Sequence, residues 1–384
     1  MELNNISPNS KQVYFLVLYL KMGGIEVITT NLANSLCKQG YNVTIISLLK
    51  DNDLFDHIDN RIKVEYIGNF KQHKALWFKG YWRLLLFKLI KKIRSINNSI
   101  IISTRDEYNI LVSSYSNKNN LKIAWLHHDY IGKPKLIKHF KYKYNNIDKF
   151  IILTEDIKEE IHKIIKPFNK TTELITIPNF LPVSTPNLND NEKSEINILK
   201  ESNYCIAVGR LSPEKGFSRL IDLWSLIKNS TSGNLKLYII GAGPEEGKLK
   251  DKIIANNLSQ DVYLLGAKSN SFSQELSKHA IAYCMTSYTE AFPLVLLEAL
   301  KAGTPQIAYD VRVGPRNLII NNITGFLIPE NNQIEYSNCI VNIYNNPELR
   351  KKLSLNSQKR AILYSENVIR DKWEHIVFKT KNKI

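Results

Sequence analysis

Short apolar runs alternate with longer amphipathic segments along the whole chain. The first run covers residues 13–20, and a Gly-Gly turn and a segment of helical periodicity over 27–39 separate it from a second run at 43–48. Runs of this length bounded by turns are typical of buried strands, and their alternation with helices is typical of parallel α/β units. Further strands are expected at 100–104, 122–126, 150–154 and 175–177.

The alternation stops once and then begins again. Residues 182–203 contain Ser, Pro, Asn and charged residues without an apolar period, so we expect a linker there. A second series of strands is expected at 204–208, 236–240, 262–264, 281–285 and 306–308. The pattern predicts an α/β fold of two Rossmann-like, doubly wound domains, over 1–181 and 204–365, that face each other across a cleft.

The composition excludes several classes of protein. With 43% hydrophobic and 23% charged residues, the chain is typical of a globular protein and not of a disordered one. Its four cysteines are widely scattered and form no CxxC pair, which favours reduced thiols in the cytoplasm. No apolar run approaches the twenty residues that a transmembrane helix needs, so we expect none.

The net charge of +16 is distributed unevenly. Residues 1–180 hold 27 Lys and Arg against 16 Asp and Glu. Such a surplus implies an anionic partner, which we expect the first half to bind: a phosphorylated substrate, an acidic membrane surface or nucleic acid. Nucleic acid is not expected, because no recognised binding module accompanies the charge.

A basic, aromatic segment in this half has no acidic residue between Tyr66 and Thr104. Its apolar residues fall on one helical stripe and its cations on the remaining surface, as in helices that lie on anionic bilayers. Packing of the stripe on the sheet with solvated cations is the alternative, and we expect both in part. The stripe consists of Phe78, Trp82, Leu85, Leu86, Leu89, Ile93 and Ile96; the membrane-facing residues are Lys79, Trp82, Arg83, Lys91, Lys92 and Arg94; a second basic patch comprises Lys133, Lys135, Lys138, Lys141 and Lys143.

Two glutamates with seven residues between them surround a predicted helix start. Pro293 suits the first helical position, and Gly303 with Pro305 ends the helix. A helix start has free backbone N–H groups and can bind an anion. Such glutamate pairs are often merely solvated. The residues expected to contact a ligand here are Glu290, Phe292, Pro293, Leu294 and Glu298.

A glycine-flanked loop follows the first strand of the second series. It reads Gly-Arg-Leu-Ser-Pro-Glu-Lys-Gly over 209–216 and places Arg210 five residues before Lys215. Arginine supplies bidentate donors and lysine a compact charge, so the two can converge on one diphosphate. Taken alone, the pair could equally be two surface cations.

Together the two motifs resemble those of the retaining glycosyltransferases of family 4, which have the GT-B architecture. The resemblance implies that Arg210 and Lys215 hold a nucleotide diphosphate, that Glu298 binds the ribose and that Glu290 orients the sugar. The acceptor hydroxyl would attack from the face that the diphosphate leaves, without a covalent intermediate. Because the cations offset the charge of the leaving group, we expect neither a metal nor another cofactor beside the nucleotide sugar.

Further features resemble the same family. Gly23 and Gly24 match its first-domain glycine loop, where the backbone approaches the donor phosphates. His127 ends a strand in a Trp-x-His pattern and is expected to contact the donor sugar, with His128 as the alternative. The helix over 366–384 is expected to cross back to the first domain. A loop over 310–316 resembles that of bacterial members that build surface glycans, although an ordinary turn explains it equally well.

The expected activity is retaining transfer of a sugar from a nucleotide-diphosphate sugar, expected to be UDP-linked. The expected acceptor is a lipid-linked or cell-surface glycan, as in lipopolysaccharide or capsule, at the inner face of the plasma membrane. Two alternatives remain open at this point. One is a GT-B epimerase or phosphorylase, and the other is a non-catalytic binder of membranes or nucleic acid, which would leave the four charged motif residues without a purpose.

Overall fold

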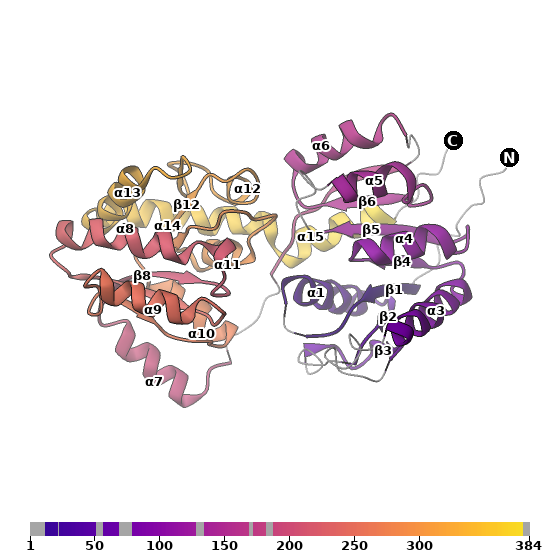
Figure 1. Cartoon of the computed structure of the whole chain (residues 1–384), viewed down its shortest axis with the longest axis horizontal. Coiled ribbons are helices and arrows are strands. Elements are labelled where there is room, and N and C mark those ends of the chain that lie inside the picture. The colour runs from indigo at the N-terminus through magenta and orange to yellow at the C-terminus, as the bar shows by residue number, and fades with distance from the viewer. Residues whose placement is uncertain are drawn as a thin grey trace. The chain divides into compact units, whose positions relative to one another are not determined.

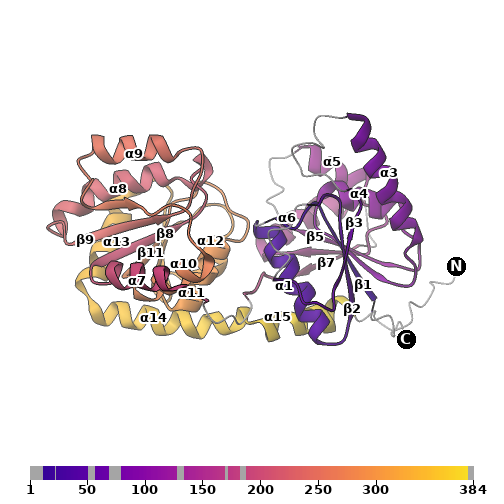
Figure 2. The same cartoon turned by 90° about the horizontal axis from the view of Figure 1, so that it is seen from below.

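The computed structural model describes residues 12–21, 23–50, 57–68, 79–127, 134–168, 172–181 and 187–378. It divides into two compact units. Unit 1 comprises Met1–Pro182 and Glu366–Ile384, and unit 2 comprises Val183–Ser365. Figures 1 and 2 show that each unit is a twisted sheet with helices on both faces.

The sheet of unit 1 has seven strands in the order β3-β2-β1-β4-β5-β6-β7, and every described pair is parallel. Strand β1 is mostly buried and pairs with β2 on one side and β4 on the other. The strands are β1 (Gln12–Val17), β2 (Asn42–Ser47), β3 (Lys63–Tyr66), β4 (Ile100–Ser103), β5 (Leu121–Leu126), β6 (Lys149–Ile152) and β7 (Glu173–Thr176).

Helices cover both faces of this sheet. On one face α1 packs with α15, and α3 and α4 pack together on the opposite face, as Figure 2 shows. The helices are α1 (Gly24–Lys38), α3 (Lys79–Ser95), α4 (Asp106–Tyr115), α5 (Pro134–Tyr142), α6 (Glu155–Ile165), α15 (Glu366–Lys372) and the π-helix η4 (Trp373–Phe378). Trp373 of η4 is fully buried against Trp125 of β5, with ring centroids 5.0 Å apart, so the last described segment packs on this sheet.

The sheet of unit 2 has six strands in the order β10-β9-β8-β11-β12-β13, again all parallel in the described pairs. These strands are rich in Ile, Leu, Tyr and Cys and are covered on both faces, as parallel strands require. They are β8 (Asn203–Val208), β9 (Leu235–Ile240), β10 (Val262–Leu264), β11 (Ala282–Met285), β12 (Gln306–Tyr309) and β13 (Gly325–Ile328).

The helices of unit 2 form two layers. Helices α8, α9 and α13 cover one face, and α10, α11 and α14 pack together on the other. The helical elements are α7 (Asp190–Leu199), η2 (Pro213–Lys215), α8 (Phe217–Ser230), α9 (Glu246–Ala255), α10 (Asn270–His279), α11 (Leu294–Ala302), α12 (Pro315–Leu318), α13 (Gln333–Asn345), α14 (Pro347–Ala361) and η3 (Ile362–Tyr364).

Helix α7 lies within the segment that the sequence indicated to be a linker. Its start is fixed by a capping box, in which Asn189 accepts from the Glu192 backbone and the Glu192 side chain accepts from the Asn189 backbone. Lys268 then pairs with Glu195 at 2.6 Å. Hydrophobic periodicity did not predict this helix, because Ile196 is its only buried side chain.

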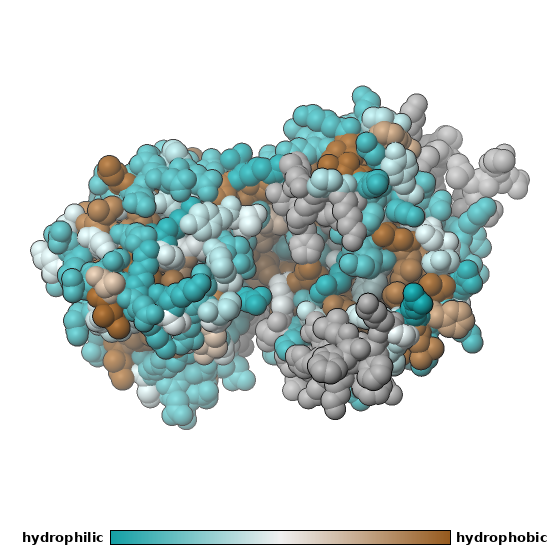
Figure 3. Space-filling view, in the orientation of Figure 1, coloured by the Kyte–Doolittle hydropathy of each residue, from teal (hydrophilic) through white to brown (hydrophobic). Residues whose placement is uncertain are grey.

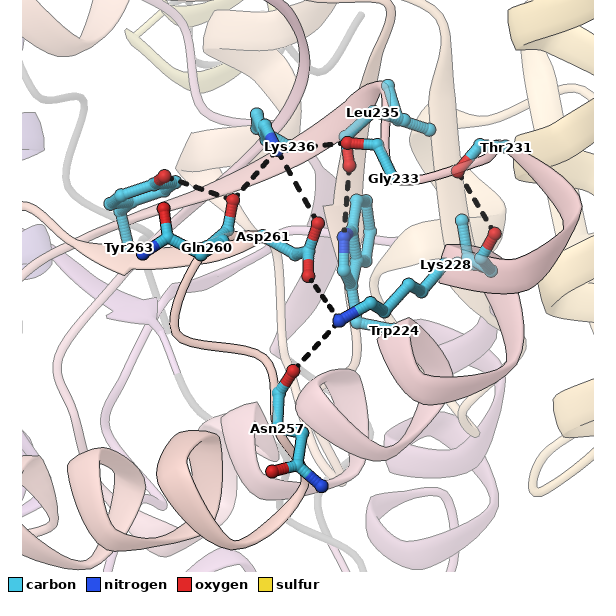
Figure 4. Close-up of polar contacts among 11 residues, drawn as sticks. Trp224, Lys228, Thr231, Gly233, Leu235, Lys236, Asn257, Gln260, Asp261 and Tyr263 are labelled. Carbon is cyan, nitrogen blue, oxygen red and sulfur yellow. Dashed lines mark hydrogen bonds and ion pairs between the residues drawn. The ribbon is translucent and has the colours of Figure 1, made fainter.

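A cluster of charged side chains links α8, β9 and the turn before β10 at the amino-terminal edge of the unit 2 sheet. The Asp261 carboxylate is 3% exposed and pairs with Lys228 at 3.0 Å and Lys236 at 3.5 Å. Both lysines also donate to backbone carbonyls of neighbouring turns, as Figure 4 shows. The opposite, carboxyl-terminal edge of the same sheet carries the site described next.

The sequence predictions of the fold class hold. Two doubly wound, parallel sheets are present, and the ends of each predicted strand lie within three residues of those of an observed strand. Strands β3 and β13 were not predicted, because β3 has no buried residue and only two of the four residues of β13 are buried.

Candidate functional site

The site in unit 2 lies where the direction of strand connection reverses. From β8 the chain builds outward to β9 and β10 and then returns to place β11 on the other side of β8. In open α/β sheets, ligands bind at the carboxyl ends of the two strands that flank such a switch point. The loops that follow these strands, over 209–216 and 286–293, are the two motifs that the sequence singled out.

These two loops are hydrogen-bonded to each other. The Tyr288 N–H donates to the Glu214 carbonyl at 2.8 Å, and the Thr286 hydroxyl donates to the Gly216 carbonyl at 2.9 Å. Gly216 has φ +66°, and a Cβ there would lie 2.0 Å from the Thr286 carbonyl oxygen. The glycine that ends the cation motif is therefore required by contact with the glutamate loop.

The contact brings Lys215 and Glu290 together. The Lys215 Nζ lies 2.7 Å from Glu290 Oε1, with the two side chains 28% and 11% exposed. A partly buried ion pair of this length is stronger than an exposed one, because less water screens it. A small pocket beside the pair is lined by Val208, Lys215, Phe217, Cys284, Met285, Thr286, Ser287, Glu290 and Val295.

The other predicted cation, Arg210, lies in the same loop and is exposed to solvent. Within the described residues, no hydrogen bond or ion pair joins its guanidinium to Lys215 or Glu290. The predicted convergence of Arg210 and Lys215 on one anion therefore stays a prediction.

Two further loops support the motifs from the neighbouring strands. After β9, Gly241 approaches so closely that a Cβ there would lie 1.9 Å from the Gly209 carbonyl oxygen. After β12, Gly314 has φ +98°, and its Cβ would lie 2.9 Å from the Glu290 Cβ. Arg316, in the first turn of α12, pairs with Asp310 at 3.0 Å. The loop after β9 thus packs against the cation motif, and the loop after β12 packs against Glu290.

Glu298 lies in the second turn of α11, as the spacing predicted. Burial raises the pKa of its carboxyl to about 7, although hydrogen bonds with Asn270 and Gln274 of α10 oppose the shift. This carboxyl group therefore changes its charge near neutral pH.

Helix α11 begins one residue later than the sequence suggested. Pro293 is the N-cap, Leu294 is the first helical residue, and Gly303 ends the helix at φ +77°. Proline has no N–H group, so Pro293 cannot contribute a backbone donor to a ligand at this helix start. Phe292 is buried, and its ring centroid lies 6.1 Å from that of Tyr364.

Two buried side chains next to the site were not predicted. Tyr283 of β11 places its hydroxyl 3.1 Å from both the N–H and the carbonyl of Val208, at the end of β8. Arg219 of α8 donates to the carbonyls of Thr286 and Ser287. A sequence signal existed for Arg219, since a cation in the first turn of a helix is unfavourable unless it has a tertiary partner.

A contact within unit 1 explains the glycine at the start of α1. Gly23 is the N-cap of α1 with an extended φ of −164°, and a Cβ there would lie 2.6 Å from Glu26 Oε2. Glu26 is 4% exposed and pairs with Arg105, which follows β4, at 3.3 Å. Gly24 is exposed and begins the helix. The predicted approach of this backbone to donor phosphates stays untested.

His127 follows β5 directly, as predicted. It is 8% exposed, and its ring lies 4.5 Å from that of Trp125, centroid to centroid. The alternative, His128, lies outside the described residues. The carboxyl end of β5 therefore presents the imidazole that the Trp-x-His pattern indicated.

The basic helix α3 buries part of its predicted stripe. Leu85, Leu89, Ile93 and Ile96 are buried in unit 1, and Trp82 is half-buried. Phe78 and the Lys79 side chain lie outside the described residues, as do Lys133 and the Lys135 side chain of the second basic patch.

The outer face of α3 differs from the prediction in two respects. Lys92 pairs with Glu65 at 2.5 Å, so its charge is compensated within the unit. Leu84 and Phe87 are 47% and 65% exposed, which the sequence did not indicate. Figure 3 shows hydrophobic side chains over this helix among hydrophilic ones. The exposed cations beside them are Arg83, Lys88, Lys91 and Arg94.

The described residues contain neither a membrane span nor a cluster of metal-binding side chains. No helix there is long and apolar enough to cross a bilayer, and no three His, Cys, Asp or Glu side chains are grouped to hold a metal ion. The chain has an Asp-x-Asp pair, Asp51 and Asp53, which lies outside the described residues.

Known proteins resemble this chain over nearly its whole length. The family model "Glycosyltransferase Family 4" matches residues 22–184, and "Glycosyl transferases group 1" matches residues 189–360. An uncharacterised glycosyltransferase of Haemophilus influenzae is 29% identical over 96% of this chain and all of its own length. An α-1,4-N-acetyl-D-galactosaminyltransferase of Campylobacter jejuni, which acts on an undecaprenol-linked glycan, is 24% identical over 97% of this chain and 99% of its own.

A solved structure supports the fold. Anabaena Alr3699/HepE in complex with UDP and glucose has a TM-score of 0.75 over 94% of this chain and 97% of its own, at 17% identity. The sheet topology, the two motifs at the switch point and these similarities agree. The chain belongs to glycosyltransferase family 4 and is a retaining glycosyltransferase of the GT-B fold.

Proposed function

We propose that the enzyme transfers a sugar from a UDP-linked donor to a lipid-linked or cell-surface glycan. The observation that carries the proposal is the 2.7 Å pair between Lys215 and Glu290, which joins the cation motif to the glutamate motif at the switch point of unit 2. A bound diphosphate would attract the Lys215 ammonium group away from the Glu290 carboxylate. The carboxylate would then be free to accept a hydrogen bond from a sugar hydroxyl. UDP in the Anabaena structure supports the choice of nucleotide.

In this proposal each motif residue has one task. Lys215 and Arg210 neutralise the diphosphate as it leaves, which takes the place of a metal ion. Glu298 accepts hydrogen bonds from the ribose hydroxyls, and Glu290 orients the sugar for attack by the acceptor hydroxyl. His127 is proposed to contact the donor sugar, and His127→Ala should lower kcat while UDP still binds.

The direct test removes the ammonium group. Lys215→Ala should weaken UDP binding by about ten- to a hundredfold, the loss expected for one charge-assisted contact, and should abolish transfer. Lys228→Ala is the matched control, because it also breaks a lysine–carboxylate pair of unit 2 but at the opposite sheet edge. Full activity of the Lys215 variant would refute the proposal.

The product distinguishes the alternative reactions. With an undecaprenol-linked glycan as the acceptor, a transferase forms a longer glycan and releases UDP. An epimerase would instead change the sugar of the donor without any acceptor, and a phosphorylase would require inorganic phosphate. The similarity to the Campylobacter enzyme supports the lipid-linked acceptor.

We also propose that α3 docks the enzyme on an anionic bilayer, from which such an acceptor would be reached. Leu84 and Phe87 supply apolar area, and the four exposed cations around them each contribute on the order of 1 kcal/mol near an anionic surface. Charge complementarity and exposed apolar area thus favour the same partner.

Vesicle sedimentation tests the docking. The protein should bind phosphatidylglycerol vesicles and not phosphatidylcholine vesicles, and Leu84→Ser with Phe87→Ser should reduce binding. Ile334→Ser with Leu355→Ser is the control, because these side chains of unit 2 are similarly exposed. Unchanged binding of the α3 variant would reject α3 as the docking surface.

A further inference from the structure

Arg219 is a buried cation in an unfavourable position. It is the third residue of α8, where the positive end of the helix dipole repels it, and its side chain is only 7% exposed. A cation is retained in such a place only if strong contacts compensate for both costs.

The contacts of Arg219 hold one loop. Its Nε donates to the Thr286 carbonyl and its Nη2 to the Ser287 carbonyl, each at 2.6 Å. Its guanidinium carbon lies 3.8 Å from the ring centroid of Tyr288 and 4.4 Å from that of Tyr309. Three consecutive residues after β11 are therefore bound by one side chain, which is anchored in turn by Glu330 at 3.4 Å.

This loop leads directly to Glu290, two residues after Tyr288. We propose that Arg219 is a positioning residue, which fixes the loop after β11 so that the Glu290 carboxylate faces Lys215 and the donor sugar. The proposal rests on the proposed function for the role of Glu290. It assigns Arg219 no contact with the substrate.

Only arginine suits this task. Two carbonyls of adjacent residues require two donors at a fixed spacing, which the planar guanidinium provides and a lysine ammonium cannot reproduce. The same plane stacks between Tyr288 and Tyr309, so the loop is restrained along two directions. Arg219→Lys keeps the charge but loses this geometry.

Unit 2 contains a matched control. Lys236 of β9 donates to the Gly233 carbonyl at 2.9 Å and to the Gln260 carbonyl at 2.7 Å, and it also pairs with Asp261. It therefore holds two backbone carbonyls as Arg219 does, but at the opposite edge of the sheet from Glu290 (Figure 4). Lys236→Met should cost stability without moving Glu290.

Kinetics on the full chain test the proposal. Because displacement of a reacting group by about 1 Å can cost up to a hundredfold, Arg219→Lys should lower kcat by about ten- to a hundredfold. The Kd for UDP should stay within about threefold of the wild-type value, since the diphosphate contacts are kept. Arg219→Met should lower kcat further, and Lys236→Met should leave kcat within about twofold. Equal loss of kcat in the two methionine variants would overturn the proposal.

Hydrogen exchange gives a readout that needs no turnover. Amides over 286–292 should exchange at least about tenfold faster in Arg219→Lys than in Lys236→Met. Unchanged exchange there overturns the proposal even if the wild-type enzyme is active. If the wild type transfers no sugar but this loop still loosens, Arg219 positions the loop and the proposed function fails instead.

Discussion

The titration of one carboxyl group at the site has a consequence for donor binding. Since the pKa of Glu298 is about 7, the group is mostly neutral at pH 6 and mostly charged at pH 8. A carboxylate accepts hydrogen bonds from ribose hydroxyls more strongly than a neutral acid does. We therefore expect the Kd for UDP to fall by up to about tenfold between pH 6 and pH 8, measured by calorimetry. In Glu298→Gln this dependence should vanish, while ionisation of UDP itself affects both proteins alike. A parallel pH dependence in the variant would contradict the ribose contact.

The same shift predicts the opposite trend for the free enzyme. The pKa of Glu298 is higher in the folded than in the unfolded chain, so the folded state binds more protons between about pH 4.5 and 7. Its contribution to stability is complete at low pH and is lost as the pH rises through 7. Urea unfolding without UDP should therefore show wild-type stability falling relative to Glu298→Gln over this range. A constant difference between the two proteins would show that burial does not shift the group.

The sequence indicated which residues form the two motifs, but it did not indicate which other side chains contact these motifs. Lys215, Glu290 and Glu298 stand in local motifs, and the family resemblance singled them out. Arg219 and Tyr283 form hydrogen bonds with residues that lie 67 and 75 positions away in the sequence. No local sequence pattern contains such contacts. The exposed Phe87 was missed for a related reason, because a helical stripe predicts which side is buried but not where its edge lies.

At the scale of the elements, the site depends on how closely loops approach. Gly314→Ala would place a Cβ 2.9 Å from the Glu290 Cβ and 3.1 Å from the Pro293 Cδ, at φ +98°. We expect kcat to fall by about tenfold or more, because the glutamate must move. Gly233→Ala is the control, since it has a similarly unfavourable φ of +69° but its Cβ would make an ordinary 3.5 Å contact at the opposite sheet edge. Each should lose about 1–2 kcal/mol of stability. Equal kcat in the two variants would show that this loop does not position Glu290.

The strands and most helices follow from hydrophobic periodicity because parallel sheets bury both faces of each strand. Elements with few buried side chains do not follow from this periodicity. The polar helix α7 was predicted to be a linker, although the sequence of its capping box is present at Asn189 and Glu192. The short strand β13 is defined by its pairing with β12, which lies 19 residues earlier and so outside the local pattern of β13 itself.

At the scale of the whole molecule, the chain leaves unit 1 after β7 and returns to it after α14, so unit 1 is built from both ends of the sequence. Each unit has its own sheet and its own buried tryptophan: Trp373 in unit 1 and Trp224 in unit 2 are both fully buried. Replacing either by alanine should cost about 3–5 kcal/mol, through lost burial and the cavity that remains.

Calorimetry should then assign the unfolding transitions. Trp373→Ala should lower the Tm of one transition and Trp224→Ala the Tm of the other, because the two side chains belong to different cores. UDP should raise the transition that responds to Trp224→Ala, since a ligand stabilises the part of the chain that binds it. If UDP instead raised only the transition lowered by Trp373→Ala, the diphosphate would be held by unit 1. The proposed roles of Lys215 and Glu298 in binding the donor would then be wrong.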